Sequence, residues 1–321
     1  MTFPKDQISK LSALVVGDVM IDAYLWGDVH RQSPEAPVPV LNKTGKDSRI
    51  GGAGNVARNV IAMGAKAHLA SVIGNDISGK YLEQILGEKG IGTSAIITEH
   101  GRTSTVKTRI IKGTEHMLRI DEETTDPLTD KAKSELKQAI IELLDKGGID
   151  VIIVEDYDKG VMDEELAKFL IEQSRSREIA ITVDPKLKNF KAYKGVNLFK
   201  PNLKELREGL HADVDPNSES SLQAASEALN NTIEAQITLT TLGGDGMWLS
   251  VGGEGTHING IERNVVDVSG AGDTVIAVAS LMLAAGASPE EMAKAANIAG
   301  GQVCEKSGVV VVDIDTLASE F

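Results

Sequence analysis

Short apolar runs rich in β-branched residues alternate along the chain with segments of helix length. The runs are ALVVGD (13–18), AHLASVIG (67–74), DVIIVED (150–156), IAITVDP (179–185), VNLFKPN (196–202) and AQITLTTLGG (235–244). Uniformly apolar strands suit a sheet that is covered on both faces, so this alternation predicts an α/β fold with a mostly parallel central sheet. Parallel sheets bind ligands at the carboxyl ends of their strands, and these runs end in polar residues or glycines.

Two intervals depart from this pattern. Residues 19–50 contain several prolines and alternating apolar positions, and residues 103–121 alternate around a Lys-Gly turn. Alternation with a period of two is typical of strands with one exposed face. We predict a small antiparallel β lid, inserted in a single domain that spans residues 1–321, because an isolated hairpin is only marginally stable.

Composition and charge narrow the possible partners. The net charge of −14 and the 3% aromatic content argue against a nucleic-acid or anionic-membrane surface. The N-terminal region has no secretory signal pattern and no stretch is long enough to span a membrane, so we expect a cytoplasmic protein. The single Cys304 forms no internal disulfide and the six histidines lack zinc-ligand spacing. Because the protein carries so much negative charge, any phosphate that it binds must be held by groups in direct contact with it.

The stretch VDVSGAGDTVIAV precedes an apolar run that predicts a buried helix ending at Gly286. Gly270, Ala271 and Gly272 place unpaired backbone N–H groups of the first turn where no side chain obstructs them. Such an N-terminus can bind the oxyanion of a phosphoryl group while Asp273 accepts the proton of an attacking hydroxyl. The alternative is that Asp273 only favours the first helical turn and the glycines serve packing.

A second glycine-rich segment, RIGGAGNVARNVIAMGA, allows three interpretations. Gly52, Gly54 and Ala57 satisfy the loose G-x-G-x-x-A dinucleotide pattern, which would indicate a hydride-transfer enzyme. That pattern requires an apolar strand before it, whereas NKTGKDSRI is charged. Alternatively, Gly51 and Gly52 bring backbone close to a polyol and Asn55 bonds a sugar hydroxyl. The third interpretation is structural: the glycines close a loop onto the next helix.

In LFKPNLKELREGL, Asn202 and Glu205 lie three residues apart, on one face of a predicted helix. An amide oxygen and a carboxylate in this position could hold the hydration shell of Mg²⁺. The same spacing is that of a capping box, which is the structural alternative. No G-x-x-x-x-G-K-[ST] motif occurs, so a kinase of this sequence would not be a P-loop kinase.

Charged residues near the strand ends and in the lid complete the candidate site. Asp18 and Asp22 could accept hydroxyl protons from a sugar, although strand-end acids are usually just solvated. Basic residues here are candidate phosphate partners in so acidic a protein, although any one such residue is more often a solvated surface charge. They are Lys107, Arg109, Arg119, Lys159 and Lys186.

Together these motifs resemble the ribokinase-like carbohydrate kinase family over essentially the whole chain. GGAGNVARNVIAMGAKAHLASVIGND is similar to its N-terminal signature and DVSGAGDTVIAV to its C-terminal one. GDVHRQSPEAPVPVL, LRIDEE, EDYDKG, VDPK and KPNLKE resemble the kinase half of bifunctional heptose 7-phosphate kinase/heptose 1-phosphate adenylyltransferases. The resemblance implies a three-layer sandwich, a homodimer joined through the lid, and phosphorylation by ATP, with Mg²⁺, of the anomeric hydroxyl of D-glycero-D-manno-heptose 7-phosphate. This reaction leads to the ADP-heptose of lipopolysaccharide cores.

The resemblance also implies roles for individual residues. Asp273 would be the catalytic base and the backbone of Gly270, Ala271 and Gly272 the anion hole. The sugar would be held by Asp18, Asp22, Gly51, Gly52 and Asn55, and its 7-phosphate by Lys107, Arg109, Arg119 and Lys159. Asn202 and Glu205 would act near Mg²⁺ and the nucleotide phosphates, which Lys186 could also reach. The pocket for adenine and ribose would be lined by Thr241, Gly243, Gly246 and Asn297.

Three features depart from the family pattern. Glu155 stands where a serine is usual, and Lys200 where a small polar residue is common. The sequence contains no H-x-G-H motif, so we expect adenylylation to belong to a separate adenylyltransferase. Other hypotheses are a kinase for another sugar or sugar phosphate, such as fructose, ribose or a hexose phosphate, and a non-catalytic sugar or nucleotide sensor. The last alternative hypothesis is a dehydrogenase.

Overall fold

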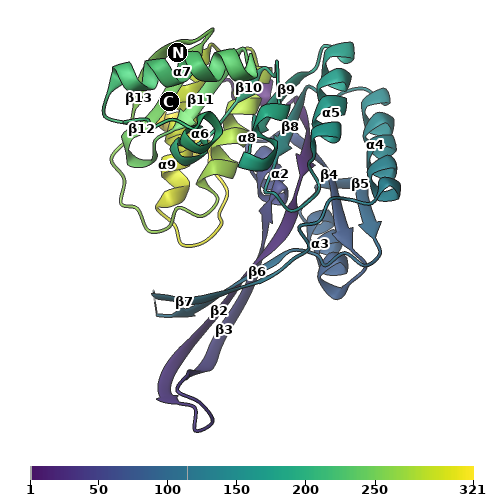
Figure 1. Ribbon diagram of the computed structural model, residues 1–321, viewed down its shortest axis with the longest axis vertical. Helices are drawn as coiled ribbons and strands as arrows, with labels where there is room; N and C mark the ends of the chain where they lie inside the picture. The colour runs from purple at the N-terminus through teal and green to yellow at the C-terminus, as the bar shows by residue number, and fades with distance from the viewer. Residues whose placement is uncertain (1, 114) are drawn as a thin grey trace.

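The computed structural model describes residues 2–113 and 115–321 and contains an α/β body from which a long, narrow lid extends (Figure 1). The central sheet has nine strands in the order β13-β12-β11-β10-β9-β8-β1-β4-β5. The pairings from β11 to β5 are parallel, and β12 and β13 add an antiparallel edge, which confirms the predicted α/β class. Its strands are β1 (Ser12–Gly17), β4 (Lys66–Gly74), β5 (Gly92–Glu99), β8 (Val151–Glu155), β9 (Ala180–Asp184), β10 (Leu198–Phe199), β11 (Ile237–Thr241), β12 (Gly246–Val251) and β13 (Glu254–Asn259).

Helices cover both faces of this sheet, and each face has its own apolar cluster. Successive residues of β1 point to opposite faces, and Leu14 and Val15, one on each face, are both fully buried. Helices α2, α3, α8 and α9 pack on one face and α4, α5 and α7 on the other. The helices are α1 (Lys5–Ile8), α2 (Ala53–Ala62), α3 (Ile77–Glu88), α4 (Asp130–Asp145), α5 (Glu164–Arg177), α6 (Leu203–Leu210), α7 (Glu219–Ile233), α8 (Ala271–Ala284), α9 (Pro289–Cys304) and α10 (Ile314–Glu320).

Helix α8 is the apolar helix that the sequence predicts after the GAGD stretch. Every residue from Asp273 to Met282 is buried, because α2 and α9 pack against it. The helix ends at Ala284, shortly before Gly286, whose φ of +80° is left-handed and favours glycine. The first turn of α8 lies beside the carboxyl ends of β9 and β11, because Gly270 and Gly272 line one cavity with Asp184 and Thr241.

The lid is a separate sheet of four strands in the order β3-β2-β6-β7. It consists of β2 (Val19–Gln32), β3 (Pro39–Gly52), β6 (Val106–Lys112) and β7 (Glu115–Glu122). The hairpins β2–β3 and β6–β7 are antiparallel, as the sequence predicts. They join through a parallel pairing of β2 with β6, which the sequence did not predict. The alternation of apolar and polar residues along a strand indicates which of its faces is exposed, but not which strand lies beside it. That pairing is decided by the tertiary structure.

Across residues 2–113 and 115–321, every helix is too short or too polar to cross a lipid bilayer.

Candidate active site

Two adjoining cavities open at the first turn of α8, where the carboxyl ends of the parallel strands meet. The first has a volume of about 560 Å³ and the second about 400 Å³. Among the predicted site residues, those lining the first are Lys186, Asn202, Thr241, Gly243, Gly270, Gly272 and Asp273. Those lining the second are Thr241, Gly243, Gly246, Ala271, Gly272 and Asn297. The structure thus brings the residues predicted for the base, the anion hole and the nucleotide to one continuous hollow.

Asp273 lies in the wall of the first cavity and is only 3% exposed. Its Oδ2 accepts a hydrogen bond from Asn55 Nδ2 at 2.8 Å, and its Oδ1 accepts one from the Tyr157 hydroxyl at 2.7 Å. Burial raises the pKa of Asp273 to about 6, although these two hydrogen bonds oppose the rise. A carboxylate with this pKa is ionised at neutral pH and still basic enough to take a proton from a reacting hydroxyl.

The turn before α8 leaves amide groups available for an anion. Gly270 has a φ of +81°, and no side chain caps the helix. Within the described part of the chain, the N–H groups of Gly270 and Gly272 have no acceptor, whereas Ala271 N–H donates to the Val268 carbonyl at 3.2 Å. Two of the three amides predicted for the anion hole are therefore free, and their binding of a phosphoryl group stays a prediction.

Asn55 makes a contact that the sequence analysis does not predict. It was expected to bond a sugar hydroxyl, but its amide nitrogen bonds Asp273. Its Oδ1 is buried and has no partner among the described residues. Asn55 therefore orients the predicted base, and a sugar contact through its free oxygen stays a prediction.

Asp18 is engaged by the backbone of the loop after β8. Its carboxylate accepts N–H groups from Tyr157 at 2.8 Å, Lys159 at 3.2 Å and Val161 at 3.1 Å. Burial raises the pKa of Asp18, while these three hydrogen bonds oppose that rise. Asp18 thus holds the loop that carries Tyr157, and its predicted contact with a sugar is not tested by these bonds.

Asp22 and the two neighbouring glycines form a tight group at the base of the lid. Asp22 forms an ion pair with Arg109 of β6, one strand away. A Cβ on Gly51 would stand 2.0 Å from Asp22 Oδ2, and a Cβ on Gly52 would stand 2.3 Å from the Asp18 carbonyl. Glycine is needed at both positions because any side chain would collide with the protein's own atoms. This agrees with the interpretation in which the glycines close a loop onto the next helix. Their predicted approach to a polyol stays a prediction.

The cations predicted for a distal phosphate are all paired with carboxylates. Lys159 Nζ donates to Glu123 at 2.7 Å, whereas Lys107 Nζ lies between two carboxylates, 3.6 Å from Asp121 and 3.8 Å from Glu123. Arg119 pairs with Asp121 at 2.8 Å. Glu123 thus links Lys107 to Lys159, and Asp121 links Lys107 to Arg119, whose side chain is 57% exposed.

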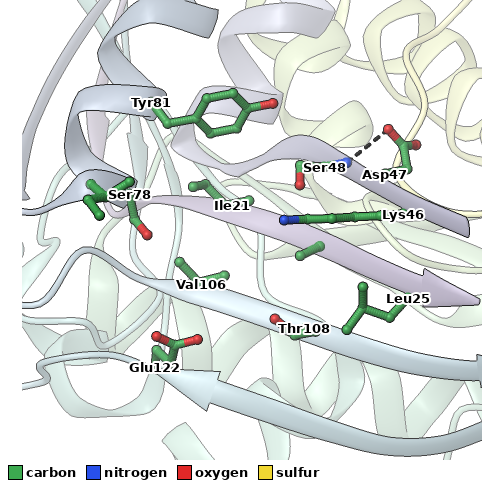
Figure 2. Close-up of a pocket in the computed structure, with 12 residues that line it drawn as sticks. Ile21, Leu25, Lys46, Asp47, Ser48, Ser78, Tyr81, Val106, Thr108 and Glu122 are labelled. Atoms are coloured by element: carbon green, nitrogen blue, oxygen red, sulfur yellow. Dashed lines mark hydrogen bonds between the residues drawn. The ribbon is translucent and has the colours of Figure 1, made fainter. Parts of the chain in front are cut away.

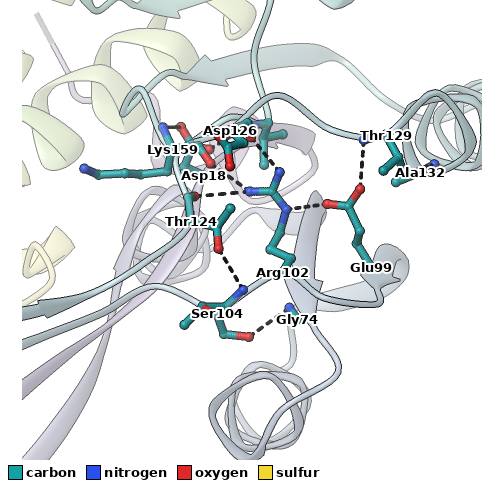
Figure 3. A network of polar contacts seen from close by, with 12 residues as sticks. Asp18, Gly74, Glu99, Arg102, Ser104, Thr124, Asp126, Thr129, Ala132 and Lys159 are labelled. Carbon is teal, nitrogen blue, oxygen red and sulfur yellow. Dashed lines mark hydrogen bonds and ion pairs between the residues drawn. The ribbon is translucent and has the colours of Figure 1, made fainter.

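A buried arginine that the sequence analysis missed holds the base of the lid (Figure 3). Arg102 Nε donates to Glu99 at 2.5 Å, and its guanidinium donates to the carbonyls of Thr124, Asp126 and Lys159. The fork of N–H donors suits several carbonyls at once. Arg102 thus connects the segment before β6, the segment after β7 and the Lys159 loop. No local motif marks it, because its partners come from distant parts of the chain.

Asn202 and Glu205 form the capping box of α6. Asn202 Oδ1 accepts from Glu205 N, and Glu205 Oε2 accepts from Asn202 N, both at 2.9 Å. The other oxygen of Glu205 accepts from Lys186 Nζ at 2.5 Å. Although burial lowers it, the charges of Asp184 and Glu205 raise the pKa of Lys186 above its usual range. Both oxygens of Glu205 are thus occupied, so the pair does not fit direct metal coordination.

Tyr157 and Asp184 are further cavity residues that the site prediction omitted. Tyr157 lies in EDYDKG, two residues after the end of β8, and bonds Asp273. Asp184 is the last residue of β9 and pairs with Lys200 at 2.8 Å. The rule that ligands gather at carboxyl ends of parallel strands marks both positions, and it is the signal that could have found them.

A third cavity of about 640 Å³ lies on the face of the lid sheet opposite to the one that carries the Asp22–Arg109 ion pair (Figure 2). Ile21, Leu25 and Val106 line it from the lid, and Tyr81 from α3. Because strand residues alternate, Asp22 and Arg109 are on the other face. One face of the lid is thus charged and the other largely apolar.

The sequence profile of the pfkB family of carbohydrate kinases matches residues 10–316, and the chain belongs to this family. It is therefore a phosphotransferase that acts on a sugar hydroxyl, and the family implies the use of ATP. The family and fold predicted from the motifs are confirmed.

Curated relatives are similar over nearly the whole chain. Bifunctional protein HldE of Desulfatibacillum aliphaticivorans is 41% identical over 323 residues, which cover 100% of this chain and 65% of the relative. HldE of Paramagnetospirillum magneticum is 39% identical over 95% of this chain and 62% of its own length. The chain thus spans slightly less than two thirds of these relatives.

Solved structures agree on the fold. Phosphofructokinase-2 from Escherichia coli in complex with potassium has a TM-score of 0.79 at 19% identity, with 97% of each chain covered. Ribokinase from Arabidopsis thaliana with ribose and ATP has a TM-score of 0.74 at 14% identity, covering 96% of this chain and 98% of that one. At such identities the likeness establishes the ribokinase-like fold alone.

Proposed function

We propose that this protein phosphorylates the anomeric hydroxyl of D-glycero-D-manno-heptose 7-phosphate with MgATP. The observation that carries the kinase chemistry is the buried Asp273 beside two unpaired amides at the start of α8. The substrate rests on the resemblance of EDYDKG, LRIDEE and the lid segment to heptose 7-phosphate kinases. The similarity to proteins named HldE supports it.

In the proposed reaction Asp273 removes the proton of the anomeric hydroxyl as its oxygen attacks the terminal phosphorus of ATP. The new O–P bond forms, the bridging bond to ADP breaks, and the proton goes to Asp273. The N–H groups of Gly270 and Gly272 stabilise the oxygens of the phosphoryl group in transit. Asn55 and Tyr157 keep the carboxylate oriented throughout.

Mg²⁺, which the kinase family implies, does not have a protein-built cage here. Among residues 2–113 and 115–321 no group of three acidic, cysteine or histidine side chains is placed to hold a metal. Asn202 and Glu205 are used by the capping box and by Lys186. We propose that Mg²⁺ arrives on the nucleotide phosphates, where it neutralises charge, as it usually does in kinases. The two residues would act on it only through water.

At the sugar end, we propose that the 7-phosphate displaces carboxylates from their cations. Lys107 and Lys159 share Glu123 on the charged face of the lid, and Arg109 is held by Asp22. A phosphate that exchanges with Glu123 would gain two lysine contacts at once. Arg119 has a more exposed side chain than Lys107 and is the weaker candidate.

The proposal is tested by measuring ADP release with heptose 7-phosphate, fructose 6-phosphate, ribose and fructose as acceptors. We expect a kcat/KM for heptose 7-phosphate that exceeds the others by at least tenfold. Preference for an unphosphorylated sugar would overturn the substrate assignment. ATP binding without ADP release for every sugar would instead indicate a sensor.

We further propose that the chain is one domain with its inserted lid, and that two copies associate through the apolar face of that lid. Leu118 is 59% exposed and Ile120 is 44% exposed on β7, and Ile77 of α3 is 88% exposed near the same cavity. Light scattering should give twice the chain mass for the wild type and the single mass for Ile120→Glu. A monomeric wild type would contradict this arrangement. The separate downstream adenylyltransferase stays a prediction.

A further inference from the structure

Three buried ionisable side chains adjoin the first turn of α8. Lys200 Nζ lies 2.8 Å from Asp184 Oδ2, and the two side chains are 3% and 6% exposed. Glu155 is fully buried, and neither of its carboxylate oxygens has a hydrogen-bond partner within the described chain. Glu155 lies beside Asp184 in the parallel pairing of β8 with β9. The cluster therefore has two carboxyl groups and one ammonium group.

The charge state of the cluster follows from its burial. Burial raises the pKa of Glu155 well above its usual range, and the negative charges of Asp184 and Asp273 raise it further. Burial thus favours the protonated form of Glu155, while Lys200 and Asp184 contact each other as an ion pair. Stability does not explain this pair, since a buried ion pair contributes no more than well-packed apolar residues would.

The position of Lys200 points to an anion. Lys200, Gly270 and Gly272 line the same cavity, and Lys200 Nζ is 3.6 Å from the point where a Cβ on Gly272 would stand. The start of a helix carries partial positive charge, which an adjacent ammonium group alone would oppose. A phosphate between the free amides and the ammonium group would be attracted by both.

We propose that Lys200 is a phosphate-binding residue, whose ammonium group turns from Asp184 to the phosphoryl group that is transferred from ATP. The inference rests on the proposed kinase site and adds a residue to it. Lys186 differs, because it is held by Glu205 and its side chain is 29% exposed nearer the rim. Asp184 is the carboxylate that Lys200 contacts, and it is the group with which a phosphate would compete for Lys200.

Dissociation constants of ATP and ADP, measured with Mg²⁺ and without sugar, test this role. In Lys200→Met we expect ATP to bind at least tenfold more weakly and ADP to change less than threefold, because only ATP carries the phosphate that Lys200 contacts. Lys194→Met is the control, since Lys194 is an exposed lysine paired with Glu234 outside the cavity. It should leave both constants unchanged. Equal weakening of ATP and ADP, or no change, would overturn the proposal.

A second variant covers the case in which Lys200→Met fails to fold because Asp184 loses its partner. Asp184→Asn combined with Lys200→Met removes both charges of the buried ion pair, and the same selective loss of ATP affinity is expected relative to Asp184→Asn alone. Normal ATP binding by the double variant would overturn the proposal, since Lys200 would then only neutralise the cluster. A wild type that binds ATP but phosphorylates another sugar would overturn the heptose assignment and leave this test intact.

Discussion

The entrance of α8 and the charged face of the lid differ in what their groups already contact. At α8 the amides of Gly270 and Gly272 have no acceptor within the described residues, and their cavity is open. At the lid, Arg109 is paired with Asp22, and Lys159 of the loop after β8 is paired with Glu123. The first region is preorganised for a ligand, whereas the second must exchange an internal partner for one.

This difference has a physical origin in the type of group. Backbone amides at a helix start are aimed by the helix itself and cannot turn away to another partner. Long basic side chains can reach any nearby carboxylate, and a chain with a net charge of −14 supplies many. Substitutions at the start of α8 should therefore alter catalysis more than stability. Substitutions in the lid should alter stability more than catalysis.

The largest effect is expected for Asp273→Asn. Loss of the general base should lower kcat by about 10²–10⁴-fold, while the affinity for ATP changes little. Steady-state kinetics and a nucleotide titration measure the two effects, and thermal unfolding checks that the variant folds. Turnover near that of the wild type would remove Asp273 from the role of base.

The next effect concerns the lid. Arg109→Met should lower the free energy of unfolding by about 3 kcal/mol, because it leaves Asp22 buried without its counter-charge. Arg119→Met is the matched comparison, and its exposed pair with Asp121 should cost under about 0.5 kcal/mol. Urea unfolding measures both. An equal loss of unfolding free energy in the two variants would mean that burial of the Asp22–Arg109 pair does not affect stability.

Gly270→Ala sharpens the comparison at the helix start. The φ of +81° and a Cβ 2.8 Å from Asn55 Nδ2 should cost about 1–2 kcal/mol of stability. Displacement of Asn55 and of the amide should also reduce kcat. Gly286→Ala is the control, with a φ of +80° at the other end of α8 and no neighbouring atom within 4 Å. A similar loss of stability without loss of kcat is expected there, and equal kcat losses would contradict the anion hole.

The smallest effect is a shift in the pH profile. The base must be ionised, so kcat/KM should fall below about pH 6, where Asp273 is protonated. Tyr157→Phe removes a hydrogen bond that lowers this pKa, so the acidic limb should move to higher pH by about one unit or less. Tyr193→Phe is the matched control, because that buried hydroxyl donates to Asp156 at 2.7 Å instead. An unmoved limb in Tyr157→Phe would separate the tyrosine from the base.

Local patterns predicted much of the fold and part of the site. Apolar runs marked six strands of the central sheet, and GAGD marked the start of α8 and the position of Asp273. These features depend on hydrogen bonds and periodicities within a few residues. The parallel pairing of β2 with β6 and the network of Arg102 depend on distant segments, and no local pattern encodes them.

The sequence by itself determined the family, the parallel sheet, and the glycine-flanked acid at a buried helix. Only the tertiary structure decided that Asn202 and Glu205 cap α6, that Asn55 and Tyr157 bond Asp273, and that the lid cations are paired. The reason is that backbone geometry is set by neighbouring residues. The partner of a side chain is set by which oppositely charged or hydrogen-bonding groups the fold brings within about 3 Å.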